Sequence, residues 1–160
     1  MKSSLDKKRV IITGASGFIG GKLLSYLQKK ESYEILALYY SHPIESTLFK
    51  TLSIDITDGD SLETLKNFLP DFIIHCAAMT GIRFCEENVE KAFLLNVEGS
   101  RNIANLTQEC GARMLYLSTD TVFDGVKGAY VEDDCTHPLH VYGQTKLAGE
   151  KIVQELCPNS

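Results

Sequence analysis

The sequence predicts an α/β fold, a doubly wound parallel sheet of about five strands, and three observations support this prediction. Short apolar stretches that read as buried strands alternate along the chain with stretches whose apolar residues recur at helical spacing. The first apolar stretch passes into a helical stretch through three glycines spaced three apart, Gly14, Gly17 and Gly20. No repeat, low-complexity tract or linker interrupts the alternation. Right-handed crossovers between successive strands then give a parallel sheet with helices on both faces, a Rossmann-type architecture.

The stretch from Val10 to Gly20 joins the first expected strand to the first expected helix. We expect Gly14 and Gly17 to adopt backbone angles closed to other residues and to let a phosphate approach the main chain. Gly20 lets the helix lie close to its strand. The free N–H groups and positive dipole end of the helix face this loop, which predicts a site for an anion such as a dinucleotide pyrophosphate. The alternative is an ordinary tight turn between a strand and a helix.

The next two elements complete a βαβ unit. Helical spacing predicts a first helix with Phe18, Ile19, Leu23, Leu24 and Leu27 on its apolar face and Gln28 to Lys30 at its end. A second strand over 34–40 ends where dinucleotide-binding folds contact the adenosine ribose. Tyr40, Ser41 and His42 stand there in place of a carboxylate, which favours NADP over NAD, with NAD still possible.

The remaining elements follow in order. We expect strands over 51–54, 72–78 and 113–118, with the 72–78 strand buried on both faces, and helices over 61–69, 86–110 and 140–156. Asp58 or Asp60 is the expected cap of the 61–69 helix. Three polar residues carry open alternatives. Asp55 either caps its loop or accepts a hydrogen bond from an adenine amino group. His75 is expected to be a satisfied core or strand-end histidine rather than a catalytic one. Asn96 is either a surface amide or a buried hydrogen-bonding group.

Composition excludes several functional classes. The net charge of −5 is spread without a basic stripe, which argues against nucleic acid and against an anionic membrane as partners. The start of the chain is polar and no apolar run approaches the roughly 20 residues that span a bilayer, so we expect a soluble, cytoplasmic protein. Five dispersed cysteines lack metal-ligand spacing and predict reduced structural thiols and no metal site: Cys76, Cys85, Cys110, Cys135 and Cys157.

Candidate catalytic residues lie late in the chain. Ligands of open parallel sheets sit beyond the carboxyl ends of the strands, which places Ser118, Thr119 and Asp120 near the glycine loop. Tyr142 and Lys146 share one face of the last helix, so the ammonium could lower the pKa of the phenol. Such a phenol can give a proton to a carbonyl oxygen that Thr119 also hydrogen-bonds. The same spacing occurs in Tyr26 to Lys30, but at the opposite edge of the sheet from the glycine loop.

With these residues identified, the chain resembles the extended short-chain dehydrogenase/reductase family. Thr13 to Gly20 is similar to its nucleotide loop, and Tyr142 to Lys146 is similar to its catalytic pair. More narrowly, Leu117 to Gly125 and Pro138 to Glu150 are similar to the dTDP-4-dehydrorhamnose reductase branch. Thr121 departs from the Tyr usual in that branch, and Arg83 stands where an Asp is common. Nucleotide-sugar dehydratases of the wider family resemble the chain less. They carry an acidic residue directly after a Thr-Asp pair, and Thr121 stands at that position here.

The resemblance implies a role for each matching residue. Tyr142 is the implied proton donor, Lys146 its partner and ribose ligand, Thr119 the hydroxyl on the substrate carbonyl, and Asn96 the residue that supports the lysine. Implied substrate contacts are Thr80, Thr119 and Asp120. The expected cofactor contacts are Gly14, Ser16, Gly17, Phe18, Ile19 and Gly20 in the loop, then Tyr40, Ser41, Asp55, Ile56, Ala77, Ala78, Met79, Leu117, Tyr142 and Lys146.

The resemblance also implies an activity and an extent. The implied activity is NAD(P)H-dependent reduction of a keto group on a nucleotide-linked sugar. The alternative is an NADP-binding regulatory subunit without catalysis, resembling the regulatory subunit of methionine adenosyltransferase; a homo-oligomer or a protein partner is compatible with either. Family members continue into a sixth strand and a substrate domain, so we expect residues 1–160 to be one NAD(P)-binding domain, truncated before strand six, with part of its sheet exposed.

Overall fold

A single parallel sheet of five strands organises the computed structural model, which describes residues 7–158 and 160. The strand order is β3-β2-β1-β4-β5, and every neighbouring pair is parallel. This is the order of a dinucleotide-binding Rossmann sheet, so the predicted fold class is confirmed. The strands are β1 (Lys8–Thr13), β2 (Tyr33–Tyr39), β3 (Lys50–Ser53), β4 (Phe72–His75) and β5 (Arg113–Tyr116).

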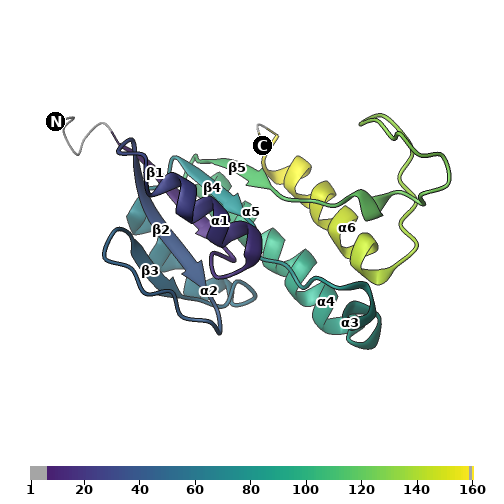
Figure 1. Cartoon of the computed structure of the whole chain (residues 1–160), viewed down its shortest axis with the longest axis horizontal. Helices are drawn as coiled ribbons and strands as arrows, with labels where there is room; N and C mark the ends of the chain where they lie inside the picture. The colour runs from purple at the N-terminus through teal and green to yellow at the C-terminus, as the bar shows by residue number, and fades with distance from the viewer. Residues whose placement is uncertain (1–6, 159) are drawn as a thin grey trace.

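Helices cover both faces of the sheet (Figure 1). They are α1 (Phe18–Leu27), α2 (Gly59–Leu62), the 3₁₀ turn η2 (Glu63–Phe68), α3 (Ile82–Glu87), α4 (Val89–Phe93), the π-helical turn η3 (Leu94–Gly99), α5 (Ser100–Glu109), the 3₁₀ turn η4 (Asp120–Val122) and α6 (Val141–Leu156). Figure 1 shows α1 in front of the sheet and α5 behind it. The long segment between η4 and α6 extends away from the sheet.

Alternate residues of the central strands supply the two cores. Val10 and Ile12 of β1 pack with Leu24 and Leu27 of α1. Ile11, between them, belongs to the larger core built with α5 and α6. The middle strand β1 therefore buries both of its faces, as in a sheet wound on both sides.

The expected single helix over 86–110 is wrong. Asn88 has non-helical backbone angles, φ −136° and ψ 54°, and its side-chain amide donates to the carbonyl of Phe84 at 3.0 Å. Asparagine competes for backbone hydrogen bonds in this way, and the chain divides there into α3 and α4. A π-helical turn over Leu94–Gly99 then joins α4 to α5. A constant period of 3.6 residues does not predict such a turn.

Four smaller expectations also need correction. Phe18 and Ile19 lie at the start of α1 but are 83% and 56% exposed, so the core face of α1 consists of later leucines. The basic stretch after Leu27 lies beyond the end of α1. The expected 61–69 helix is a short α-helix followed by a 3₁₀ turn, and Asp58 is confirmed as its cap, accepting from the N–H of Asp60 at 3.2 Å. β4 ends at His75, and alternate residues of this strand remain half-buried.

The structure also constrains membrane and metal chemistry. None of the helices in the described part of the chain is long and apolar enough to cross a membrane. Among residues 7–158 and 160, no group of three or more His, Cys, Asp or Glu side chains could hold a metal ion. All five cysteines are free thiols.

Candidate cofactor cleft and active site

The glycine loop has the geometry of a phosphate cradle. Gly14 has φ +61°, and a Cβ at this position would lie 2.7 Å from the backbone of Ala77, so no other residue fits. The N–H of Gly17 donates to the carbonyl of Gly14 at 2.9 Å. Gly17 itself has φ −77°, which is open to any residue, so the expectation of special backbone angles holds for Gly14 and is wrong for Gly17. A Cβ at Gly20 would overlap the Gly14 carbonyl, as expected for close packing of α1.

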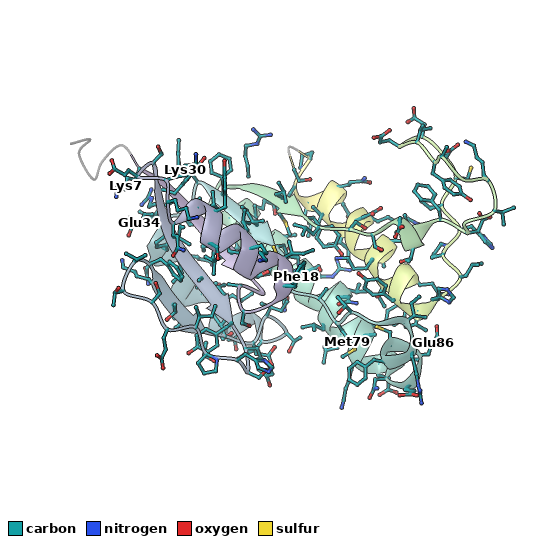
Figure 2. All side chains as sticks on the ribbon, in the orientation of Figure 1. Lys7, Phe18, Lys30, Glu34, Met79 and Glu86 are labelled. Atoms are coloured by element: carbon teal, nitrogen blue, oxygen red, sulfur yellow. The ribbon has the colours of Figure 1, made fainter. Side chains whose placement is uncertain are left out.

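A cleft of about 440 Å³ opens beside this loop at the carboxyl ends of β1, β2 and β4. Most of the expected cofactor contacts line it: Gly14, Ser16, Gly17, Tyr40, Ser41, Asp55, Ile56, Ala77, Ala78 and Met79. Figure 2 labels Phe18, at the start of α1, and Met79, in the loop that follows β4. The cleft therefore lies at the edge of the sheet where ligands of this architecture bind.

Six expected contacts do not line the cleft: Phe18, Ile19, Gly20, Leu117, Tyr142 and Lys146. The first three belong to the first turn of α1, which lies beside the cradle, and Gly20 acts by packing. The N–H of Leu117 donates to the carbonyl of His75 at 3.3 Å, which continues the pairing of β5 with β4.

The residues present fit a dinucleotide. The N-terminal end of α1 follows the cradle directly, and Ser16 and Gly17 are exposed there, so free backbone N–H groups face an incoming phosphate. At the end of β2 the exposed Tyr40 and Ser41 line the cleft without a carboxylate, and Ser41 hydrogen-bonds the His42 ring at 3.0 Å. The geometry accommodates a pyrophosphate at one end and an adenosine ribose at the other.

Asp55 lines the cleft but is also a loop cap. One carboxylate oxygen accepts from the backbone N–H of Thr57 at 2.9 Å and from its hydroxyl at 2.7 Å. The loop-capping alternative is therefore present in the structure, and the second carboxylate oxygen is the one left to face a ligand.

His75 is a satisfied core histidine, as expected. Its Nε2 lies 3.0 Å from the hydroxyl of Ser100, which donates its own proton to the Asn96 carbonyl, so Nε2 carries the hydrogen. Nδ1 then accepts from the hydroxyl of Thr13 at 2.7 Å, and that hydroxyl accepts from the N–H of Ala77. Burial, with the nearby Lys146 charge, lowers the His75 pKa to about 3. The neutral ring ties β1, β4 and the helix behind them together under the cleft.

Asn96 is the buried bonding group of the two alternatives. Its Oδ1 accepts from the N–H of Met79 at 2.7 Å, and its Nδ2 donates to the Met79 carbonyl and to the Thr145 hydroxyl, both at 3.0 Å. The π turn carries this residue. Asn96 thus fixes the loop that lines the cleft against α6, where it contacts Thr145, the neighbour of Lys146.

Tyr142 and Thr119 meet because α6 carries a glycine at its start. A Cβ at Gly143 would overlap the carbonyl of Thr121, so only glycine lets the η4 turn lie against this helix. The Thr119 hydroxyl lies 3.1 Å from that of Thr121 and 3.3 Å from a carboxylate oxygen of Asp120. Burial raises the Tyr142 pKa, and a hydrogen bond with Thr119 offsets part of the increase. This direction is opposite to the one expected from the tyrosine–lysine spacing.

Lys146 is 2% exposed and lies over the ring of Tyr116, with its Nζ 3.8 Å from the ring centroid. Burial lowers its pKa to about 8, while Glu150 and Cys76 act in the other direction. Cys76, which lines the cleft, interacts electrostatically with Lys146, so the ammonium lies near the cleft. The implied substrate contacts Thr80 and Asp120 are both exposed at this end of the molecule.

Sequence reasoning missed part of the cleft and of its support. Thr13, Tyr39 and Cys76 adjoin strand ends, and that position alone is the signal that could have found them. Lys91, Leu94 and Leu95 reach the cleft from the helix opposite, which only the tertiary fold places there. Gly143 and Gly149 stand inside a helix, where a glycine is costly enough to signal close packing.

Comparison with known proteins agrees with this geometry. The chain is 38% identical to the dTDP-4-dehydrorhamnose reductase of Aggregatibacter actinomycetemcomitans over 154 residues, 95% of this chain and 49% of the reductase. It is 37% identical to methionine adenosyltransferase 2 subunit beta of Xenopus laevis over 150 residues, 94% of this chain and 44% of that protein.

Solved structures give the same result. The dTDP-4-dehydrorhamnose reductase of Bacillus anthracis, in complex with NADP, matches with a TM-score of 0.82 and 35% identity, over 96% of this chain and 51% of the reductase. The chain spans about half the length of the curated relatives it matches. The model of one family, described as RmlD substrate binding domain, matches residues 8–160. The glycine cradle, the strand order and this match over almost the whole chain together place the protein in the RmlD substrate binding domain family.

Proposed function

We propose that this chain forms the cofactor-binding and proton-donating part of an NADP(H)-dependent reductase, which reduces a keto group on a nucleotide-linked sugar. The observation that carries the proposal is the convergence of two features at one edge of the sheet. Cys76 lines the cleft beside the glycine cradle, and Lys146 is close enough to Cys76 to interact with it electrostatically. Tyr142 lies one turn before Lys146 on α6, next to Thr119.

The chain's own residues have complementary tasks in this proposal. NADPH, when bound, supplies the hydride that reaches the carbonyl carbon. Tyr142, whose pKa is raised, stays protonated at neutral pH and donates its phenolic proton to the carbonyl oxygen. Thr119 hydrogen-bonds the same oxygen, and the Lys146 ammonium stabilises the phenolate that the transfer leaves.

The relatives support the same reading. The reductase of A. actinomycetemcomitans is named for a keto sugar carried by dTDP, and the B. anthracis enzyme holds NADP. Tyr40 and Ser41, which take the place of a ribose-binding carboxylate at the end of β2, leave a 2′-phosphate unopposed and favour NADP over NAD. The names of these relatives support a nucleotide-linked keto sugar, with the keto group at C4, as the proposed substrate class.

The test measures NADPH oxidation with dTDP-4-dehydrorhamnose, using the protein at its full natural length. Tyr142→Phe removes the proton that the mechanism needs, and we expect turnover to fall by about 10²–10⁴-fold with little change in NADPH affinity. Tyr26→Phe is the matched control, because Tyr26 lies four residues before Lys30, stands 60% exposed and contacts Lys30 on the surface. Full turnover by Tyr142→Phe would contradict the assignment.

A second candidate is a regulatory subunit that binds NADP and acts through a partner protein. The 37% identity to methionine adenosyltransferase 2 subunit beta favours it, since this value nearly equals that for the reductase. The two candidates separate in one preparation. Saturable NADPH binding without sugar reduction, together with a stable complex with a methionine adenosyltransferase catalytic subunit, would replace the reductase by this alternative.

A further inference from the structure

Tyr116 is the aromatic residue at the end of β5, and its ring faces the ammonium of Lys146. The Nζ atom lies 3.8 Å from the ring centroid, well inside the distance at which a cation is attracted to an aromatic face. Among residues 7–158 and 160 this ammonium makes no ion pair and no hydrogen bond. Although this lysine is only 2% exposed, its pKa falls no lower than about 8, so it is largely charged at neutral pH, and its ammonium contacts the Tyr116 ring.

The position of Tyr116 is fixed from three sides. Its hydroxyl donates to the backbone carbonyl of Lys146 at 3.3 Å, and its ring lies 5.7 Å from that of His75. Gly149, one turn later on α6, leaves the space for the hydroxyl, because a Cβ there would overlap it. A side chain anchored in this way holds its ring face toward the ammonium.

The other charged and titratable groups around Lys146 are few. Tyr142 and Glu150 lie on its own helix, His75 and Cys76 lie at the end of β4, and Cys85 of α3 and Asp120 of η4 lie beside Tyr142. His75 is neutral, and burial raises the pKa of Cys76 to about 11, so neither supplies a negative charge at neutral pH. The Glu150 carboxylate raises the Lys146 pKa through its charge, without forming an ion pair with the ammonium. The ring of Tyr116 is therefore the direct support of the buried charge.

We propose that Tyr116 is a positioning residue for Lys146: the face of its ring holds the ammonium in its charged form near the cofactor cleft. The catalytic consequence rests on the proposed function, because it matters there that Lys146 carries a charge when Tyr142 loses its proton. The interaction itself does not depend on any activity. It requires the electron-rich ring face, and it does not require the tyrosine hydroxyl.

The test follows from that distinction. Lysine labelled with ¹³C at Cε is incorporated into the chain, and the pKa of Lys146 is read from its NMR titration, with Lys146→Arg identifying the signal. Residue 116 is varied through Tyr116→Phe and then mono-, di- and trifluorinated phenylalanine, which weaken the ring face at nearly constant shape. We expect the pKa to stay close to its starting value of about 8 in Tyr116→Phe and to fall with each fluorine, by about one pH unit in total.

The outcomes separate this proposal from the proposed function. A pKa that does not change along the fluorinated series overturns the role of Tyr116, whatever the turnover of Tyr142→Phe. A drop in Tyr116→Phe as large as in the trifluorinated variant overturns it as well, because the hydroxyl would then be responsible. A graded fall supports it whether or not the protein reduces a sugar. In an active reductase the same series should shift the pH profile of kcat and leave KM for the sugar unchanged.

Discussion

Lys146 shows how burial decides the chemistry of a single residue. Its pKa falls from 10.5 to about 8 because the charged form loses its hydration. Between these two values the unfolded chain binds more protons than the folded one, so the free energy of unfolding rises with pH in that window. Below pH 8 the ammonium is charged in both states and the full cost of burying it applies.

Lys146→Met tests this account at the residue scale. We expect the variant to be more stable than the wild type at pH 7, by about 1–3 kcal/mol, because the shift of the pKa corresponds to about 1.4 kcal/mol per pH unit. The advantage should shrink as the pH rises from 8 to 10.5, where the wild-type lysine becomes neutral in the fold. Urea unfolding of both proteins across this range measures it, and a difference that does not change with pH would contradict the assignment.

The sequence predicted which residues form the candidate site better than it predicted the surroundings of each residue. The order of Thr119, Tyr142 and Lys146 along the chain is enough to place them at one sheet edge. The direction in which the Tyr142 pKa shifts could not be predicted from the sequence. It depends on burial and on where the Lys146 ammonium points, and that ammonium points to Tyr116. Asn96 stayed open for the same reason, since its partner Thr145 lies 49 positions away along the chain.

At the scale of elements, the first turn of α1 holds two neighbouring glycines, and its packing requires only one of them. Gly20 faces the Gly14 carbonyl and the Ala15 backbone, and a Cβ there has no room. Gly21 is the next residue of the same helix, and a Cβ there would meet only the Ala15 carbonyl at 3.7 Å, an ordinary contact. The two positions share helix propensity and sequence neighbourhood and differ in packing.

The two alanine variants should therefore move in opposite directions. Gly20→Ala forces α1 away from its strand and should lower the free energy of unfolding by about 2–3 kcal/mol. Gly21→Ala gains helix propensity and should raise it by about 0.5–1 kcal/mol. Thermal or urea unfolding measures both. Equal effects of the two substitutions would show that close packing of α1 does not depend on Gly20.

Elements with a regular period were predictable, and those with local irregularities were not. The alternation of strand and helix patterns along the sequence predicted all five strands near their observed positions. The break at Asn88 and the π turn over Leu94–Gly99 were missed, because both come from hydrogen bonds that depart from a constant helical period. The exposure of Phe18 was missed because periodicity does not reveal that the first turn of α1 borders the open cleft.

At the scale of the whole molecule, β5 forms one edge of the sheet and pairs, within the described residues, with β4 alone. A second groove, of about 470 Å³, lies on the α1 side of the sheet, and Leu115 in it is 54% exposed. Other lining residues come from the central strands: Val10, Phe72 and Ile74. The expected exposure of part of the sheet is therefore present, and an apolar strand edge of this kind favours self-association.

Leu115→Lys should relieve that exposure. We expect the 160-residue chain to bind the apolar dye ANS and to associate with rising concentration, and the variant to do both less. Val126→Lys is the control, since Val126 is 85% exposed and lies outside the groove. Sedimentation together with dye fluorescence gives the result. An equal reduction by both variants would mean that added charge, and not the groove, controls association.

The central claim is that the cleft beside the glycine cradle binds NADP(H), and a fluorescence titration of NADPH into this chain tests it most directly. Gly17→Val is the informative variant, because Gly17 is exposed, lines the cleft and has backbone angles that valine also adopts. Gly21→Ala is the matched control on the same helix. The account predicts saturable binding to the wild type and to Gly21→Ala, and binding at least about tenfold weaker to Gly17→Val at unchanged circular dichroism. Absence of saturable binding to the folded wild type, or equal affinity in Gly17→Val, would contradict it.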